Sequence, residues 1–199
     1  MKTSIRPGGR SARVRAAVMA ATLDELARNG YADLTVEKIA DRAGVNKTTI
    51  YRRWSDLDGV LAEVLAELGA TVVVIPDTGS FDGDLRTLGA MVQAALTDPP
   101  VAALLTGLAA AAPRSARAAA VLRDFFTERY RLAAEIVDRA VARGELPPDT
   151  DGYAVIEAVS APFYHRLLLT RQPLDDRLTT QTVLAATAAA RSGAFIPHL

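Results

Sequence analysis

Apolar residues recur every three to four positions along most of this chain, which is the spacing of one face of an α-helix. The pattern predicts helices at residues 11–29, 36–43, 47–54, 56–74, 81–96, 101–112, 115–143, 153–170 and 174–192. The β-branched run at 71–75 would equally suit a short strand, but the segments after residue 80 show no strand alternation. We therefore predict an all-α fold.

The segment 35–54, TVEKIADRAGVNKTTIYRRW, has the pattern of two short helices joined by a tight turn. Gly44 stands where the chain must reverse, because glycine reaches a left-handed conformation without a Cβ penalty. Ala40 is small enough to let the helices cross closely. Ile50 and Trp54 lie one turn apart on the face that packs inward.

The opposite face of the second short helix is basic and rich in hydroxyl groups. Six residues able to hydrogen-bond bases or phosphates follow the predicted N-cap Asn46: Lys47, Thr48, Thr49, Tyr51, Arg52 and Arg53. A basic helix face alone is usually only a solvated surface. Here the turn glycine and the apolar anchors lie in register with that face, so the segment predicts a helix-turn-helix that binds DNA.

The charge distribution agrees with a polyanion bound at one end of the chain. Residues 1–60 hold 11 Lys and Arg against 7 Asp and Glu, a net charge of +4. Residues 61–199 hold 12 against 16, a net charge of −4. Phosphates would therefore be drawn to the N-terminal part alone.

Several classes of site and location are disfavoured by composition. The chain has no cysteine and only two distant histidines, so we expect no disulfide, no metal site and no cofactor. The longest apolar run, at 100–113, is shorter than the about 18 residues of a membrane span. No apolar signal core follows the basic N-terminus, and we expect a soluble cytoplasmic protein without a membrane partner.

Two helices near the C-terminus are more apolar than one chain of this size needs. The segment 153–170 carries apolar residues on two sides, and 174–192 is rich in alanine, which permits close helix packing. Pro162 is expected to kink the first of these helices. We therefore predict a homodimer with a four-helix interface. The residues assigned to this interface are Val155, Val159, Phe163, Leu167, Leu178, Val183 and Ala186.

The stretch LARNGYADLTVEKIADRAGVNKTTIYRRW resembles the DNA-binding domain of the tetracycline-repressor (TetR) family, and PFYHRLLLTRQPLD and VARGELPPD resemble a C-terminal subgroup of it. The resemblance implies three parts: a flexible basic arm at 1–10, a helix-turn-helix domain at 11–55, and a helical ligand-binding and dimerisation domain at 56–199. It also implies a homodimer that binds a palindromic double-stranded operator and releases it when a small-molecule effector binds.

The same resemblance assigns roles to individual residues. Lys47, Thr48, Thr49 and Arg52 would face bases or nearby backbone, Tyr51 and Arg53 would hold phosphates, and Thr35 and Lys38 would grip phosphate at the start of the first short helix. Where the family commonly has a lysine after the tryptophan, this chain has Leu57, so no phosphate contact is implied there. Candidates for an effector pocket are Met91, Leu104, Leu108, Phe125, Phe126, Tyr130, Phe163 and Tyr164, although such residues at helical spacing also suit a plain core.

Two other functions stay open at this stage. An enzyme in the C-terminal part would need a clustered nucleophile and base, but Ser160 and His165 at i and i+5 do not share a helix face. We therefore assign no catalytic residue. A DNA-binding protein that ignores ligands would lack a cavity beneath Phe125 and Phe163.

Overall fold

The computed structural model describes residues 9–70 and 74–197, and within these ranges all regular structure is helical. The all-α prediction is confirmed. The helices pack into two compact units that each combine separate stretches of the chain. The N-terminal unit runs to Leu68 and includes Pro99–Leu122, and the C-terminal unit holds Gly69–Asp98 and the chain from Arg123 onward.

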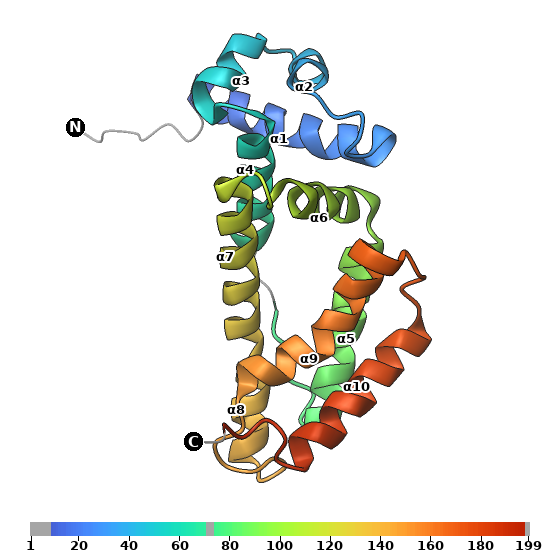
Figure 1. Ribbon diagram of the computed structural model, residues 1–199. Coiled ribbons are helices and arrows are strands. Elements are labelled where there is room, and N and C mark those ends of the chain that lie inside the picture. Colours follow the sequence, from blue (N-terminus) through green and yellow to red (C-terminus); the bar gives the residue numbers. More distant parts are fainter. Residues whose placement is uncertain (1–8, 71–73, 198–199) are drawn as a thin grey trace, which may run out of the picture. The chain divides into compact units, whose positions relative to one another are not determined.

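In the N-terminal unit, the first helix, α1, packs against both α2 and α6 (Figure 1). The helices of this unit are α1 (Arg10–Asn29), α2 (Val36–Ala43), α3 (Lys47–Trp54), α4 (Leu57–Ala70) as far as Leu68, α6 (Pro99–Ala111) and the first turns of α7 (Ala116–Ala133). Its fully buried side chains include Val18, Ile39, Ile50, Trp54, Leu61, Leu104 and Leu108.

The inclusion of α6 in this unit differs from the domain boundary at residue 55 that the sequence suggested. The physical reason is the nearly all-apolar composition of α6, which leaves no polar face for solvent. Gly107 allows α6 to pack closely, because a Cβ there would lie 2.3 Å from Cδ2 of Tyr31. Hydrophobic burial thus attaches a distant segment of the chain to α1.

The predicted helix boundaries are mostly right at the capped ends. Thr35 accepts a hydrogen bond from the Lys38 amide at 3.2 Å, and Asp56 accepts one from the Gly59 amide at 2.7 Å. Helix α1 begins at Arg10, one residue before the predicted start at Ser11, and its N-cap, Gly9, has no side chain to accept a hydrogen bond. Helix α4 is described as far as Ala70, and Val74, the expected end, is not helical.

Two sequence predictions fall on residues that the structure does not describe. The flexible arm at 1–10 lies largely outside the described residues, which begin at Gly9. The strand alternative at 71–75 involves residues 71–73, which also lie outside, and Val74 and Ile75 are in neither helix nor strand.

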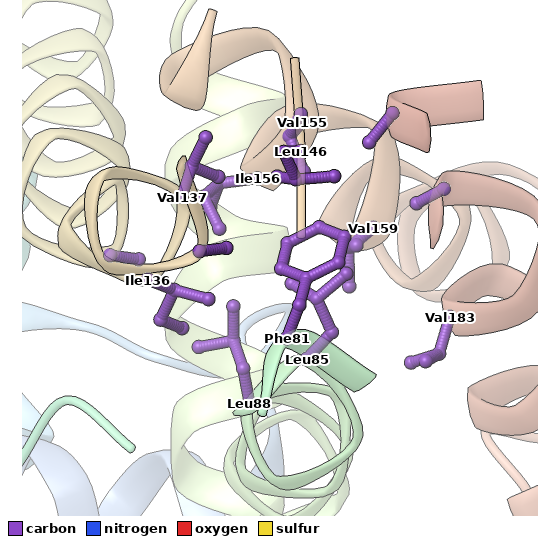
Figure 2. Packing of buried hydrophobic residues seen from close by; sticks show 14 of the residues in the cluster. Phe81, Leu85, Leu88, Ile136, Val137, Leu146, Val155, Ile156, Val159 and Val183 are labelled. Carbon is purple, nitrogen blue, oxygen red and sulfur yellow. The ribbon is translucent and has the colours of Figure 1, made fainter. Parts of the chain in front are cut away.

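The C-terminal unit surrounds one hydrophobic core (Figure 2). Its helices are α5 (Phe81–Thr97), the rest of α7, α8 (Glu135–Ala142), α9 (Gly152–His165) with the π-helical turn η1 (Arg166–Thr170), and α10 (Asp176–Arg191). Helices α5, α9 and α10 pack against one another, and α8 packs against α5 and α9. Phe81, Ile136, Val155 and Val159 are fully buried where these helices meet.

Two of the long predicted helices are interrupted. The segment 115–143 forms α7 and α8, separated at Ala134, against which Gly152 at the start of α9 packs closely. The segment 153–170 changes from α-helix to π-helix at Arg166, four residues after Pro162. Proline lacks the amide hydrogen that would bond the carbonyl of Ala158 in the preceding turn, whereas the π-helical turn lies after it, so the missing hydrogen bond at Pro162 does not account for the change of helix type.

Among the described residues, no single helix is both long and apolar enough to cross a membrane. Helices α5 and α6 reach the required length and composition only when they are taken together as a bent pair.

Candidate nucleic-acid interface

The turn between α2 and α3 has the geometry that the sequence predicted. Gly44 adopts φ 65° and ψ 33°, which lies in the left-handed region. Its backbone N–H donates to the carbonyl oxygens of Ala40 and Asp41 and so ends α2. Asn46 caps α3 by accepting the Thr48 amide at 2.9 Å. Ile50 and Trp54 have no exposed surface. These anchors fix which face of α3 points outward.

The outward face of α3 carries most of the predicted contact residues. Lys47, Thr48, Tyr51 and Arg52 are exposed, and Thr49 is half-buried beside them. The Thr48 hydroxyl also bonds Oδ1 of Asn46 at 2.8 Å, so its direction is set before any ligand binds. The face thus presents two cations and several hydroxyl groups from a fixed helix, which suits hydrogen bonding to base edges and phosphates.

The two residues predicted at the start of α2, Thr35 and Lys38, are both exposed. Thr35 accepts the Lys38 amide, so its hydroxyl oxygen already serves as the helix cap. Lys47 on α3 lies 3.6 Å from a carboxylate oxygen of Glu37 on α2. Such an exposed pair is weak and screened by salt, so the Lys47 ammonium can exchange this partner for a phosphate.

Arg53, for which the resemblance implies a phosphate contact, makes its contacts within the N-terminal unit in this structure. Its Nη1 donates to the Ser11 hydroxyl at 2.9 Å, and its Cζ lies 5.1 Å from the centre of the Trp54 ring. Nη2 is 3.9 Å from Oε1 of Glu63. The side chain therefore braces α3 against α1 and α4 within the N-terminal unit.

Glu63 on α4 supports the DNA-binding helix through contacts that its place in the sequence does not indicate. One carboxylate oxygen accepts from Arg15 of α1 and the other from the indole N–H of Trp54. Burial raises the pKa of this carboxyl, but the hydrogen bonds from Arg15 and Trp54 outweigh that effect and the net pKa is lowered. Glu63 joins α1, α3 and α4 through one charged group.

A second ion pair holds α2 against α1. The carboxylate of Glu25, only 4% exposed, accepts hydrogen bonds from Nε of Arg42 at 2.5 Å and from the side-chain Nδ2 of Asn29 at 2.7 Å. The hydrogen bond from Arg42, followed by that from Asn29, lowers the pKa of Glu25. This contact explains an acidic residue beside the apolar face of α1.

The lowered Glu25 pKa predicts a pH-dependent stability. Its contribution is present above the ordinary glutamate pKa of about 4.3 and is lost as pH falls through the lower folded value. We expect Glu25→Gln to lower the urea midpoint of unfolding at pH 7. The difference in midpoint between wild type and the variant should become smaller below about pH 4. The fluorescence of Trp54, the only tryptophan, reports this unit. Asp33→Asn, an exposed control, should change the midpoint little at either pH.

Gly44→Ala tests the turn directly. No atom lies within 4 Å of the Cβ that alanine would add, so the cost is backbone strain at φ 65° alone. We expect the unfolding free energy to fall by about 1–2 kcal/mol in urea titrations followed by Trp54 fluorescence. Gly44→Asn should lose less, because asparagine tolerates this region better. Equal losses would show that the strain argument is wrong.

The predicted effector residues are divided between the two units. Leu104 and Leu108 are fully buried in the N-terminal unit, and Met91, on α5, is partly exposed. Phe163 is a fully buried part of the C-terminal unit. The structure brings together a chain of aromatic rings formed by Phe125, Phe126, Tyr130, Tyr153 and Tyr164.

Two tyrosines in this aromatic chain have raised pKa values, and Tyr130 is buried whereas Tyr164 is half-buried. The rings of Phe126 and Tyr164 meet edge to face with centroids 4.8 Å apart, and those of Phe126 and Tyr130 are 5.8 Å apart. Burial raises the pKa of Tyr164 to about 12 and raises that of Tyr130 further. Both phenols are neutral hydrogen-bonding groups at physiological pH, as an ordinary tyrosine with a pKa of about 10 also is.

The predicted dimer residues are placed differently from the sequence expectation. Six of the seven side chains are buried inside one protomer: Val155, Val159, Phe163, Leu178, Val183 and Ala186. They pack within the C-terminal unit, so they have no surface left for a second copy. Their assignment to an interface is wrong, and only Leu167 keeps partial exposure.

The structure also separates the residues considered for catalysis. Ser160 is 2% exposed inside the C-terminal unit, whereas His165 is exposed at the end of α9. Among the described residues, no group of three or more His, Cys, Asp or Glu side chains is arranged to hold a metal ion.

Comparisons with known proteins agree with the helix-turn-helix geometry. A model of bacterial regulatory proteins of the tetR family matches residues 18–64, and one of the tetracyclin repressor-like C-terminal domain matches 75–186. The DNA-binding transcriptional repressor TetR of Mycobacteroides abscessus is 32% identical over 164 residues, covering 81% of this chain and 85% of that protein.

Two further relatives span most of the chain. YdeS of Bacillus subtilis, described as an uncharacterized HTH-type transcriptional regulator, is 29% identical over 171 residues, which cover 85% of this chain and 86% of that protein. The solved structure of the TetR family regulator SCO0332 is 32% identical, with a TM-score of 0.67 over 88% of this chain and 97% of that one. This chain therefore belongs to the TetR family of DNA-binding transcriptional regulators.

Proposed function

We propose that this regulator is a repressor that binds a palindromic operator as a homodimer and releases it when a small molecule binds in the C-terminal part. The observation that carries the proposal is the outward face of α3, with Lys47, Thr48, Tyr51 and Arg52 exposed on a helix anchored by Ile50 and Trp54. Such a face fits the major groove of DNA.

The homodimer is supported by an exposed apolar position on α10. Leu184 is 62% exposed, and Ala185 and Ala188 beside it are exposed as well. Small and apolar residues on one side of a helix permit close approach of a second helix. In a twofold dimer each of these residues meets the same surface of the partner, and a palindromic operator has the same symmetry.

Effector binding is supported by the aromatic chain of the C-terminal unit. Phe126 and Tyr164 offer apolar surface, and the neutral phenol groups of Tyr130 and Tyr164 offer specific hydrogen bonds. An effector would shift the protein from DNA only by its difference in affinity between the bound and released states.

The other functions have less support. The relatives named above are described as transcriptional regulators, which is a role without catalysis. A regulator that ignores ligands remains the alternative, and an effector screen would separate it. We expect the protein to act in the cytoplasm, where it meets the operator.

Genomic selection tests the central proposal. Fragmented genomic DNA is incubated with the purified full chain, and the bound fragments are sequenced. We expect enrichment of a short palindromic motif, which is then assayed by fluorescence anisotropy. Loss of enrichment when Thr48 and Arg52 are both replaced by alanine would assign recognition to α3. A wild-type protein that enriches no motif would refute the proposal.

A further inference from the structure

The last carbonyl group of α3 is bound by an arginine from a distant helix. Nη1 of Arg117, in the first turn of α7, donates to the Trp54 carbonyl oxygen at 2.9 Å. Both residues belong to the N-terminal unit. The final carbonyls of a helix have no donor within the helix, and a cation there also interacts favourably with the helix dipole. Arg117 supplies both the hydrogen-bond donor and the positive charge at this end of α3.

A glycine in α4 makes room for this contact. A Cβ at Gly59 would lie 2.0 Å from the Trp54 carbonyl oxygen and 2.5 Å from Nη1 of Arg117. Both distances are far below van der Waals contact. A side chain at this position would therefore displace the guanidinium, the carbonyl or both.

The turn after α3 requires external support. Ser55 adopts φ 70° and ψ −42°, a conformation with positive φ that is unfavourable for a residue with a side chain. Such conformations persist where the surrounding structure holds them. Arg117 binds the carbonyl oxygen of Trp54, the residue immediately before Ser55. It therefore holds the backbone at the C-terminal end of α3, where the chain turns.

We propose that Arg117 is a positioning residue for DNA recognition. By holding the Trp54 carbonyl it fixes the C-terminal end of α3, and with it the direction of Tyr51 and Arg52. The proposal rests on the proposed function of α3 as the DNA-contacting helix. Arg117 acts through the backbone of α3 and makes no contact with DNA itself.

The first arm of the test needs no DNA. Hydrogen exchange is followed in the full-length protein for peptides that cover residues 51–60, in wild type, Arg117→Ala and Arg117→Lys. We expect faster exchange in Arg117→Ala and near wild-type exchange in Arg117→Lys, because lysine can still donate one hydrogen bond to the carbonyl. Arg114→Ala removes an equal charge three residues earlier and should exchange like wild type.

The second arm measures binding to the selected operator and to an unrelated duplex over a series of salt concentrations. For Arg117→Ala we expect about a tenfold loss of operator affinity, the scale of one hydrogen bond from a charged donor. Affinity for the unrelated duplex and the salt slope should stay unchanged. Arg117→Lys should recover most of the loss, and Arg114→Ala should match wild type.

Each other outcome overturns the proposal. Unchanged operator affinity in Arg117→Ala would show that the contact does not position α3. Equal losses on both duplexes, with a salt slope lower by about one, would make Arg117 a direct phosphate contact. Equal losses in the alanine and lysine variants with a lower unfolding midpoint would make its role only structural. A wild type without any preferred DNA would instead refute the proposed function, while the exchange comparison would still decide whether Arg117 holds the end of α3.

Discussion

Leu184→Glu is expected to convert the regulator to a monomer and to abolish tight binding to a palindromic operator. Leu184 is 62% exposed on α10, on the side of the helix opposite the buried Val183 and Ala186. At a twofold interface the substitution places a carboxylate in the same apolar surface twice, once from each copy. Burial of such charges without partners is strongly unfavourable.

The consequence for DNA binding follows from linkage of the two helix-turn-helix units. Two linked binding sites gain about 10²- to 10⁴-fold in apparent affinity over one. Loss of the dimer should therefore reduce affinity for the full operator by at least about 100-fold, while affinity for an isolated half-site stays near that of a wild-type unit. The oligomeric state is measured by sedimentation velocity at micromolar concentration, and the affinities by fluorescence anisotropy.

Val74→Glu is the matched control, because Val74 is also an exposed apolar residue but lies outside the helices of the C-terminal unit. It should leave both the dimer and operator binding intact. If the Leu184→Glu protein still sediments as a dimer, the dimer interface lies on another surface than that of Leu184. A wild type that is already monomeric at this concentration would refute the proposed homodimer itself.

The local geometry of the helix-turn-helix could be predicted because its determinants are adjacent in sequence. The left-handed conformation of Gly44, the cap formed by Asn46 and the inward positions of Ile50 and Trp54 each depend on spacings of a few residues. Such short-range rules fix where a helix begins and which face it buries. The same rules identified most of the exposed residues on α3.

The residues of the proposed dimer surface could not be predicted in this way. Periodicity showed that the segment 153–170 is apolar on two sides, but not which side packs within the protomer. Val155 and Val159 lie in the core of the C-terminal unit, in one cluster with buried residues of α5, α8 and α10. Leu184 lies in the alanine-rich helix that was predicted to pack against a second copy, but its sequence position does not show that its side chain, and not that of Val183, is exposed.

Polar contacts between residues far apart in the chain could also not be predicted from the sequence. Arg117 binds a backbone carbonyl 63 residues away, and every residue carries such an acceptor. Glu63 receives hydrogen bonds from Arg15 and Trp54, and none of these three residues indicates its partners by spacing. The internal contacts of Arg53 were missed for the same reason. Contacts of this kind become visible only when the helices are placed in space.

Arg52→Ala and Arg53→Ala are expected to have different effects, although the two residues are neighbours of the same type. Arg52 is exposed on the outward face of α3, whereas Arg53 bonds Ser11 and lies over the Trp54 ring. Arg52→Ala should lower operator affinity by about 10- to 100-fold, the scale of a lost contact to a base edge, and should reduce the preference for operator over unrelated DNA.

Arg53→Ala should instead lower the urea midpoint reported by Trp54 fluorescence and leave that preference unchanged, because it removes a brace within the N-terminal unit. The two variants are compared with wild type on the operator and an unrelated duplex at four or more salt concentrations. If Arg53→Ala reduces the salt slope by about one, its guanidinium contacts a phosphate after all. If both variants lose the preference for operator over unrelated DNA equally, the assignment of Arg52 to DNA contact and of Arg53 to internal support is wrong.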